Sequence, residues 1–572
     1  IVKELDEMGL LVRIEDYSHN GGTHDRCKTT VEPMIKQQWF VKMDELIKPA
    51  VKAIKEGEIK LIPDRLEKTY FNWTDNIRDW CISRQLWWGH RIPAYYCKDC
   101  GEIIVAKTKD APKICPKCGS AHMEQDPDTL DTWFSSALWP FSTLGWPEKT
   151  KDLEYFYPTD VLVTGYDIIF FWVIRMIFSG YEHMGERPFK TVLFHGLVRD
   201  SQGRKMSKSL GNGIDPLEVI DKYGADALRF TLITGNAPGN DMRFYWERVE
   251  ASRNFANKVW NASRFIMMNM AQMEEAGLKY NLKEVDKKDL EDADCWILTK
   301  LNATIKDVTE NMEKFELGIA AQKINDFIWE DLCDWYIEMV KPRLYGDDAK
   351  SKEAAMWTLR YTLTNALKLL HPYMPFVTEE IFCTLKEEEG VLSENESIMV
   401  SDWPQANDEY DFAEKLEAIE VIKEAVKAIR NVRTEKNVPP SRKAQVFVVS
   451  EDEHVRGIFE NSKNFFATLA AASDVLVKEN KDGIAEDAVS ALLPQAAIYI
   501  PFADLVDISK EIERLEKEVK RLTGEVKRGE GMLSNPGFVS KAPASKIEEE
   551  KAKLENYKAT LAKVEEQLAS LR

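Results

Sequence analysis

The segment Val161-Leu162-Val163-Thr164-Gly165-Tyr166-Asp167 decides the fold class of this chain. Its first residues are apolar or β-branched, a glycine ends the run, and a stretch rich in Ile, Phe and Trp with helical character follows from residue 168. Strand, turn and helix in this order are typical of an open α/β sheet, where ligands bind beyond the carboxyl ends of the strands. We therefore predict an α/β domain with a ligand site at residues 165–167.

The bulk properties of the chain indicate a multidomain globular protein. At 572 residues the chain is too long for a single core. Nine cysteines are few for this length, and no apolar run approaches the roughly 20 residues that a membrane span needs, so we expect a cytoplasmic protein without a membrane partner. The net charge of −19 argues against a generally basic nucleic-acid binder, so any RNA contact has to come from a local basic surface.

Residues 79–240 have the pattern of an α/β domain, whereas residues 1–78 do not have the pattern of a complete domain. Strand-like and helical runs alternate over residues 79–240, which we assign to the α/β domain. Residues 1–78 mix short extended stretches with one helical stretch at 41–56. We interpret residues 1–78 as the end of a domain that begins upstream.

The middle of the chain changes to helical spacing of apolar residues. Residues 241–410 predict a helix bundle, and a polar stretch near 386–410 predicts a linker at its end. Residues 411–505 contain a long helical run followed by strand-like runs, of which 444–449 is the clearest. These residues predict a small α+β domain.

The tail, residues 506–572, predicts an antiparallel coiled coil. Two runs of apolar residues step by threes and fours, and a segment rich in Gly, Pro and Asn at 529–543 separates them as the tip. Ser545 and Glu548 have the spacing of a capping box for the second helix.

A second motif, Gly203-Arg204-Lys205-Met206-Ser207-Lys208-Ser209-Leu210-Gly211-Asn212, predicts a loop that binds polyphosphate. Lys205 and Lys208 flank Met-Ser in a stretch rich in Gly and Ser, and each lysine is a compact charge on a flexible stem. A solvated basic turn is the alternative interpretation of five such residues alone.

Four of the cysteines predict a metal site. Two Cys-x-x-Cys motifs, each followed directly by a glycine, can present four thiolates to one metal ion, as in a structural zinc site. The four candidate ligands are Cys97, Cys100, Cys115 and Cys118. A closed set of four ligands stiffens a small ribbon and performs no chemistry.

Residues 203–212 resemble the KMSKS loop of the class I aminoacyl-tRNA synthetases. Residues 79–93, with Trp-Trp-Gly-His, and residues 129–140 are similar to blocks of the valyl group of this family, and the coiled-coil tail is a third valyl trait. An isoleucyl-type ligase is the runner-up.

This resemblance implies a multidomain α/β + α fold. It comprises the second half of a Rossmann-type catalytic domain with a zinc ribbon at 95–123, an α-helical anticodon-binding domain, the small α+β domain and a coiled-coil arm that binds tRNA. The implied activity is the ATP- and Mg²⁺-dependent activation of valine and its transfer to tRNA(Val), with editing of mischarged threonine, by a monomer.

The resemblance also implies roles for individual residues. Lys205 and Lys208 are implied to be catalytic, and Trp133 and Trp172 to wall the valine pocket. The implied ATP-binding residues are Lys205, Met206, Ser207, Lys208, Ser209, Gly165, Asp167, Gly196 and Val198.

One family motif is missing from the chain. No His-x-Gly-His sequence occurs in it, and most of the editing domain has no counterpart. We therefore expect a carboxyl-terminal fragment that does not form valyl-adenylate alone. A tRNA-binding module without catalysis is the alternative from a different class of function.

Overall fold

A three-stranded parallel sheet, in the order β2-β10-β9, contains the strand predicted at residues 161–165. β9 (Thr159–Gly165) and β2 (Lys60–Ile62) both pair in parallel with β10 (Phe189–His195). The predicted α/β sheet is confirmed. The structure is a computed structural model that describes residues 1–24, 27–107, 110–207, 210–279, 285–388, 397–505, 508–539 and 543–570.

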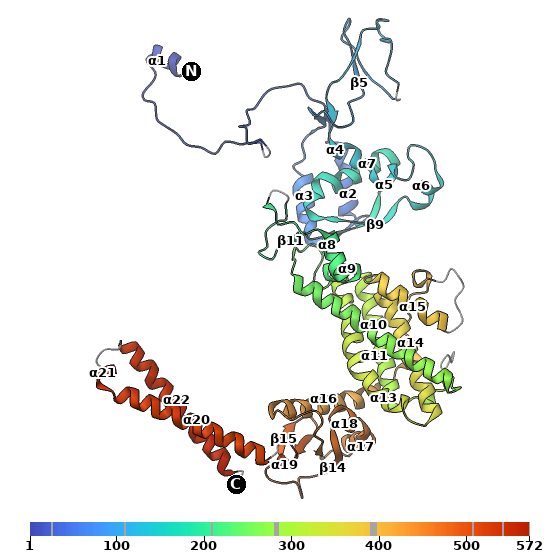
Figure 1. The fold of residues 1–572 in the computed structure, drawn as a ribbon. Coiled ribbons are helices and arrows are strands. Elements are labelled where there is room, and N and C mark those ends of the chain that lie inside the picture. Colours follow the sequence, from blue (N-terminus) through green and yellow to red (C-terminus); the bar gives the residue numbers. More distant parts are fainter. Residues whose placement is uncertain are drawn as a thin grey trace. The chain divides into compact units, whose positions relative to one another are not determined.

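The sheet belongs to the first of two compact units, residues 1–197 with 238–240 (Figure 1). Its core contains buried residues of α2 (Ile47–Lys55), α7 (Ile174–Met184) and β10. Between β9 and α7 the chain forms one 3₁₀ turn and one π turn. The unit further contains α1 (Val2–Glu7), η1 (Asp64–Leu66), α3 (Glu67–Thr74), β4 (Ser83–Arg84), β8 (Thr129–Leu130), α4 (Thr132–Ser136), α5 (Trp139–Ser142), α6 (Lys151–Phe156), η2 (Tyr166–Ile168) and η3 (Ile169–Val173).

The helix predicted at residues 41–56 is shorter than expected. The helix begins only at Ile47, and the first residue of the predicted range, Val41, instead belongs to β1 (Phe40–Val41), which pairs antiparallel with β3 (Trp80–Cys81). A strand partner that is distant in sequence here overrides local helical spacing, which is a common outcome of tertiary context.

A small antiparallel ribbon carries the cysteine pairs. β5 (Ala94–Cys97) is its central strand, between β6 (Ile103–Val105) and β7 (Met123–Gln125). The ribbon lies between β4 and β8 in the sequence, in the region predicted for it.

The second unit, residues 198–237 with 241–572, contains the predicted helix bundle. It begins with the parallel pair β11 (Val198–Arg199) and β12 (Met242–Arg243). No helix in the described part of the chain is both long and apolar enough to cross a bilayer. The helices up to residue 388 are α8 (Pro216–Tyr223), α9 (Ala225–Ile233), α10 (Trp246–Glu275), η5 (Lys287–Asp289), α11 (Asp292–Glu313), α12 (Leu317–Asp326), η6 (Phe327–Tyr336), α13 (Ile337–Leu344), α14 (Ala349–Leu370) and α15 (Pro375–Glu388).

The segment predicted as a linker is packed against the bundle where it is described. Asn302 of α11 donates to the carbonyl of Asn407 at 2.6 Å and accepts from its backbone N–H at 3.0 Å. Trp403 donates its indole N–H to Thr309 at 2.9 Å. These bonds fasten the chain between η7 (Ile398–Val400) and η8 (Asp408–Tyr410), and Glu379 of the bundle accepts from the backbone N–H of Ile398 at 3.2 Å. Residues 389–396 lie outside the described residues.

The predicted α+β segment shares its core with the bundle. α16 (Ala413–Glu435) packs on both α11 and β15, so one continuous hydrophobic core runs from the bundle into a four-stranded sheet. The sheet order is β14-β13-β16-β15, and β13 (Ala444–Val449) has the predicted bounds. The other elements are α17 (Glu453–Asn461), α18 (Lys463–Leu469), β14 (Ala472–Lys478), β15 (Val489–Leu492), β16 (Ala497–Ile500) and α19 (Phe502–Leu505).

The tail consists of two helices that lie side by side, α20 (Ile508–Ser534) and α22 (Ala544–Ser570), joined through α21 (Pro536–Val539) (Figure 1). The tip is shorter than the predicted 529–543, because α20 continues through Gly529. A Cβ atom on Gly529 would lie 3.2 Å from Leu554, so this glycine allows the helices to approach closely. Ser545 lies inside α22 and not at the N-cap that the predicted capping box requires.

Candidate active site and metal centre

The carboxyl end of β9 brings a glycine and a carboxylate together. A Cβ atom on Gly165 would lie 2.8 Å from Asp167 Oδ1 and 3.6 Å from His195 Cε1, so only glycine fits without a shift. Asp167 follows directly on the exposed rim of the sheet. A carboxylate there can accept hydrogen bonds from the hydroxyl groups of a ligand. Gly196 directly follows His195 in the chain, and its carbonyl is 2.8 Å from His195 Nδ1.

A cavity of about 610 Å³ opens in the same unit, and Trp133 of α4 lines it. Trp133 stacks on Phe171 with ring centroids 5.6 Å apart, and Trp73 stacks on Phe170 at 4.5 Å. Aromatic walls of this kind suit an apolar ligand. Further lining side chains are Met43, Trp80, Ile174 and Phe178.

A buried carboxylate organises the polar side of this cavity. Asp131 Oδ2 accepts from Trp80 Nε1 at 3.1 Å and pairs with Arg84 at 3.0 Å and with Arg175 at 3.7 Å. Asp131 also caps α4 by accepting from the backbone N–H of Trp133. The sequence interpretation assigned no role to Asp131, although it stands two residues before Trp133.

Arg175 is a buried cation that covers an aromatic wall. Its guanidinium carbon lies 3.8 Å from the centroid of the Trp80 ring, a cation–π contact. Burial lowers the pKa of Arg175 to about 10, although the charge of Asp131 counteracts this shift. The arginine therefore remains charged at neutral pH and fixes the orientation of the indole.

Trp172 does not line the cavity. Its indole Nε1 donates to the carbonyl of Ser136 at 2.9 Å, and its partly buried ring packs against the core of the first unit. Because Ser136 belongs to α4, this bond holds the helix that carries Trp133. The lining of the cavity thus includes Trp133, one of the two predicted pocket tryptophans, and does not include Trp172.

The loop with Lys205 is anchored by a buried acid. Asp200 accepts from the backbone N–H groups of Gln202 and Arg204, from Arg204 Nε at 2.7 Å and from Asn212 Nδ2 at 3.0 Å. These bonds, led by that from Asn212, lower the pKa of Asp200 to about 2. Lys205 forms a β-bridge with Arg199 at the base of the loop.

Of the other predicted loop residues, Met206 packs into an apolar cluster and Ser207 is held by a backbone hydrogen bond. Met206 packs against an apolar cluster with Val198, so its side chain serves as an anchor. The backbone N–H of Ser207 donates to Asn212 Oδ1 at 3.0 Å. Lys208 and Ser209 lie outside the described residues, and the loop from Val198 onward belongs to the second unit.

The four predicted cysteine ligands converge. Their sulfur atoms all lie within 4.8 Å of one another; Cys97 and Cys118 are 3.6 Å apart, and Cys100 and Cys115 are 3.7 Å apart. Gly101 and Gly119 take φ of +74° and +75°, which lets each turn close on its own pair. A hydrogen bond from the backbone N–H of Cys100 is the main cause that lowers the pKa of Cys97 to about 6.

Three family models match the chain in order. Residues 15–245 match tRNA synthetases class I (I, L, M and V), and residues 294–448 match the anticodon-binding domain of tRNA ligase. Residues 507–572 match the valyl tRNA synthetase tRNA binding arm.

Curated relatives agree with these matches. A valine–tRNA ligase of Clostridium tetani is 60% identical over 90% of this chain and 57% of its own length. Those of Clostridium acetobutylicum and Geobacillus stearothermophilus are 56% and 49% identical over the whole chain and 63% of their own lengths. The chain thus spans about three fifths of these relatives. Among solved structures, a Mycobacterium tuberculosis methionyl-tRNA synthetase is similar at 17% identity, 67% of this chain and 72% of that chain, with a TM-score of 0.49.

Proposed function

Because the chain belongs to the class I tRNA synthetases, in the valine–tRNA ligase group, we propose that it supplies the activating and tRNA-binding parts of a valine–tRNA ligase. The observation that carries this proposal is the match of the tail to a valyl tRNA-binding arm, on the same chain as the catalytic and anticodon-binding matches. That combination disfavours the isoleucyl alternative.

The proposed reaction has two steps. The carboxylate of valine attacks the α-phosphorus of ATP, which forms valyl-adenylate and releases pyrophosphate. A ribose hydroxyl at the 3′ end of tRNA(Val) then attacks the activated carbonyl and releases AMP. Mg²⁺ that accompanies ATP would neutralise charge on the phosphates.

The residues of the first unit suit binding of the two small substrates. Asp167, beside the compact Gly165, would accept hydrogen bonds from the ribose of ATP. Trp133 would wall the side chain of valine, with Trp172 holding α4 in position. An apolar pocket distinguishes valine poorly from the isosteric threonine, which is the standard example of this limit, so the proposal includes editing.

The loop at 203–212 would act on the leaving group. Lys205 and Lys208 carry charges that can stabilise the negative charge developing on pyrophosphate. Met206 in its apolar cluster and Asn212 on Asp200 hold the base of the loop.

The cysteine cluster fits a structural zinc ion. A tetrahedral site with Zn–S bonds of 2.3 Å has S–S edges of roughly 3.8 Å, close to the separations in this ribbon. Four protein ligands leave no open position, so we assign the ion a role in stability alone.

Valine- and isoleucine-dependent pyrophosphate exchange tests the proposal. It is measured on the chain and on the complete reading frame that contains it, together with charging of tRNA(Val). Exchange that depends on valine supports the proposal, and a preference for isoleucine favours the runner-up. If the complete protein binds tRNA but catalyses no pyrophosphate exchange, the result favours the alternative function of a tRNA-binding module without catalysis.

A further inference from the structure

Two adjacent tryptophans are fully exposed on the loop between β4 and β5. Trp87 and Trp88 have exposed fractions of 106% and 95%, and Leu86 before them is 57% exposed. Single exposed apolar side chains are common, whereas adjacent exposed indoles indicate a surface that binds a partner.

The loop is fixed at both ends. Gln85 at its start donates to Asp128 Oδ2 at 2.7 Å and to Gln38 Oε1 at 3.1 Å. A Cβ atom on Gly89 would lie 3.2 Å from Thr129, so the loop end lies directly on β8. The two indoles are therefore presented from an ordered base, which lowers the entropy lost on binding.

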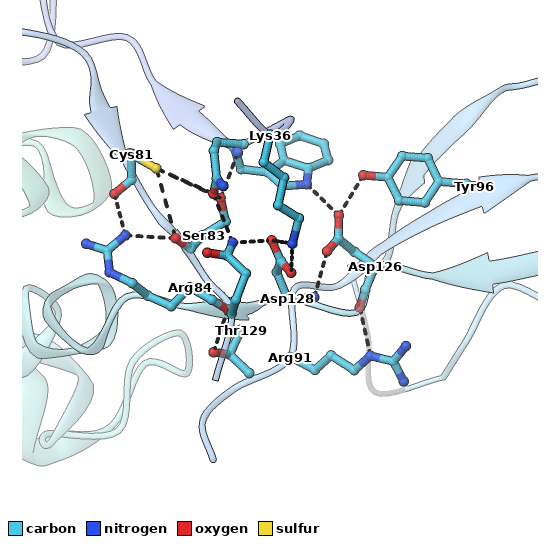
Figure 2. Close-up of polar contacts among 12 residues, drawn as sticks. Lys36, Cys81, Ser83, Arg84, Arg91, Tyr96, Asp126, Asp128 and Thr129 are labelled. Carbon is cyan, nitrogen blue, oxygen red and sulfur yellow. Dashed lines mark hydrogen bonds and ion pairs between the residues drawn. The ribbon is translucent and has the colours of Figure 1, made fainter. Parts of the chain in front are cut away.

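The charges around the loop favour an anionic partner. Arg84 and Lys36 have side chains that are 39% and 46% exposed, whereas their partners Asp131 and Asp128 are only 8% and 10% exposed. Arg91, also exposed, donates Nε–H to the backbone carbonyl of Asp126 at 2.7 Å (Figure 2) and Nη2–H to that of Gln125 at 3.0 Å. Positive charge thus faces solvent while the negative charge is buried, in a chain that is acidic overall.

We propose that Trp87 and Trp88 stack the unpaired nucleotides at the 3′ end of tRNA, with Arg84, Arg91 and Lys36 near their phosphates. Aromatic faces combined with basic side chains are the usual means of binding single-stranded nucleic acid. This inference rests on the proposed function.

The position of Arg84 indicates which part of the tRNA binds here. Arg84 directly precedes the loop and, with Asp131, also lines the cavity that contains Trp133. A nucleotide stacked on the loop therefore lies next to the proposed valine pocket. The 3′ end is the part of tRNA that the reaction requires at that place.

The test compares tRNA(Val) transcripts with and without their last four nucleotides. The chain should bind the intact transcript about tenfold more tightly, since stacking of one base contributes on that order. The double variant W87A/W88A should bind both transcripts equally, at the affinity of the shortened one. Trp139→Ala, which removes a 55%-exposed indole of α5 in the same unit, should keep the preference.

A conservative double variant separates stacking from a loss of structure. W87F/W88F should restore most of the preference, because phenylalanine keeps an aromatic face. A tenfold preference that survives in W87A/W88A overturns the inference while the proposed function stands. Failure of the unsubstituted chain to bind either transcript overturns both.

Discussion

Asn212 donates its side-chain Nδ2 to Asp200 Oδ2 at 3.0 Å and so joins the two ends of the loop that contains Lys205. Its Oδ1 accepts the backbone N–H of Ser207 at 3.0 Å. One amide thus uses both of its polar ends to shape the loop.

Removing this amide should loosen the loop. In Asn212→Ala these two hydrogen bonds are lost, and so is a third, longer one from Nδ2 to the carbonyl of Lys205 at 3.3 Å; each contributes about 1 kcal/mol. We expect hydrogen exchange of the amides at 203–207 to accelerate about 30-fold or more. The measurement is exchange followed by mass spectrometry, with Gln202→Ala in the same loop as the control. Equal rates in Asn212→Ala and the unsubstituted chain would contradict the proposed anchor.

Lys208→Ala should slow adenylate formation in the complete ligase. A cation that stabilises charge on the departing pyrophosphate contributes a few kcal/mol, so we expect a decrease of about 10²- to 10³-fold. The affinity for tRNA should change little. Pre-steady-state formation of valyl-adenylate measures the effect, and Lys190→Ala, an exposed lysine of β10, is the control. An unchanged rate refutes the role assigned to Lys208.

Removal of the metal should destabilise the ribbon. Cys97→Ser removes one of four ligands, so bound zinc should fall from about one ion per chain to a small fraction of that. Cys81→Ser, outside the cluster, should retain the ion. Elemental analysis gives the zinc content, and a chelator should lower the melting temperature in the unsubstituted chain and in Cys81→Ser, reversibly on addition of zinc. A zinc content that Cys97→Ser leaves intact argues against this site.

Substitutions of the two predicted pocket tryptophans should differ in their effect on the KM for valine. Trp133→Ala removes a cavity wall and should raise the KM for valine at least about tenfold, while the discrimination against isoleucine weakens. Trp172→Phe keeps an aromatic ring outside the cavity lining and loses the bond to Ser136, which contributes about 1 kcal/mol. We expect a change of a few-fold in its KM. Pyrophosphate exchange of the complete ligase with both amino acids distinguishes the two variants, and equal effects would contradict the placement of Trp172 outside the cavity wall.

Features that depend on local sequence were predictable. The strand ending at Gly165 follows from adjacent residues, and so do the cysteine turns and the bounds of β13, because period and turn chemistry are local signals. The α/β class, the bundle and the paired tail helices follow from the same kind of signal.

The polar side of the cavity was not predictable, because its partners are distant in sequence. Trp80 and Asp131 are 51 residues apart, and only the fold brings Arg175 onto both. The hydrogen bond from Trp172 to α4 and the close contact at Gly529 likewise depend on how elements pack. The local sequence alone predicts a turn at Gly529, although tertiary contact between the two tail helices keeps this residue helical.

A buried ionic network in the bundle provides the last prediction. Asp294 is fully buried and accepts from Tyr336 at 2.6 Å and from Arg343 at 2.8 Å through Oδ1, while Oδ2 accepts the backbone N–H of Glu291 at 2.9 Å. Asp294→Ala leaves the buried Arg343 without its main counter-charge, which typically costs about 3–5 kcal/mol. Asp292→Ala, in the same turn, breaks only a partly exposed pair with Lys415 and should cost about 1 kcal/mol or less. Hydrogen exchange of the α11 amides measures the loss of unfolding free energy in each variant. Similar losses in the two variants would show that the buried network does not stabilise the bundle.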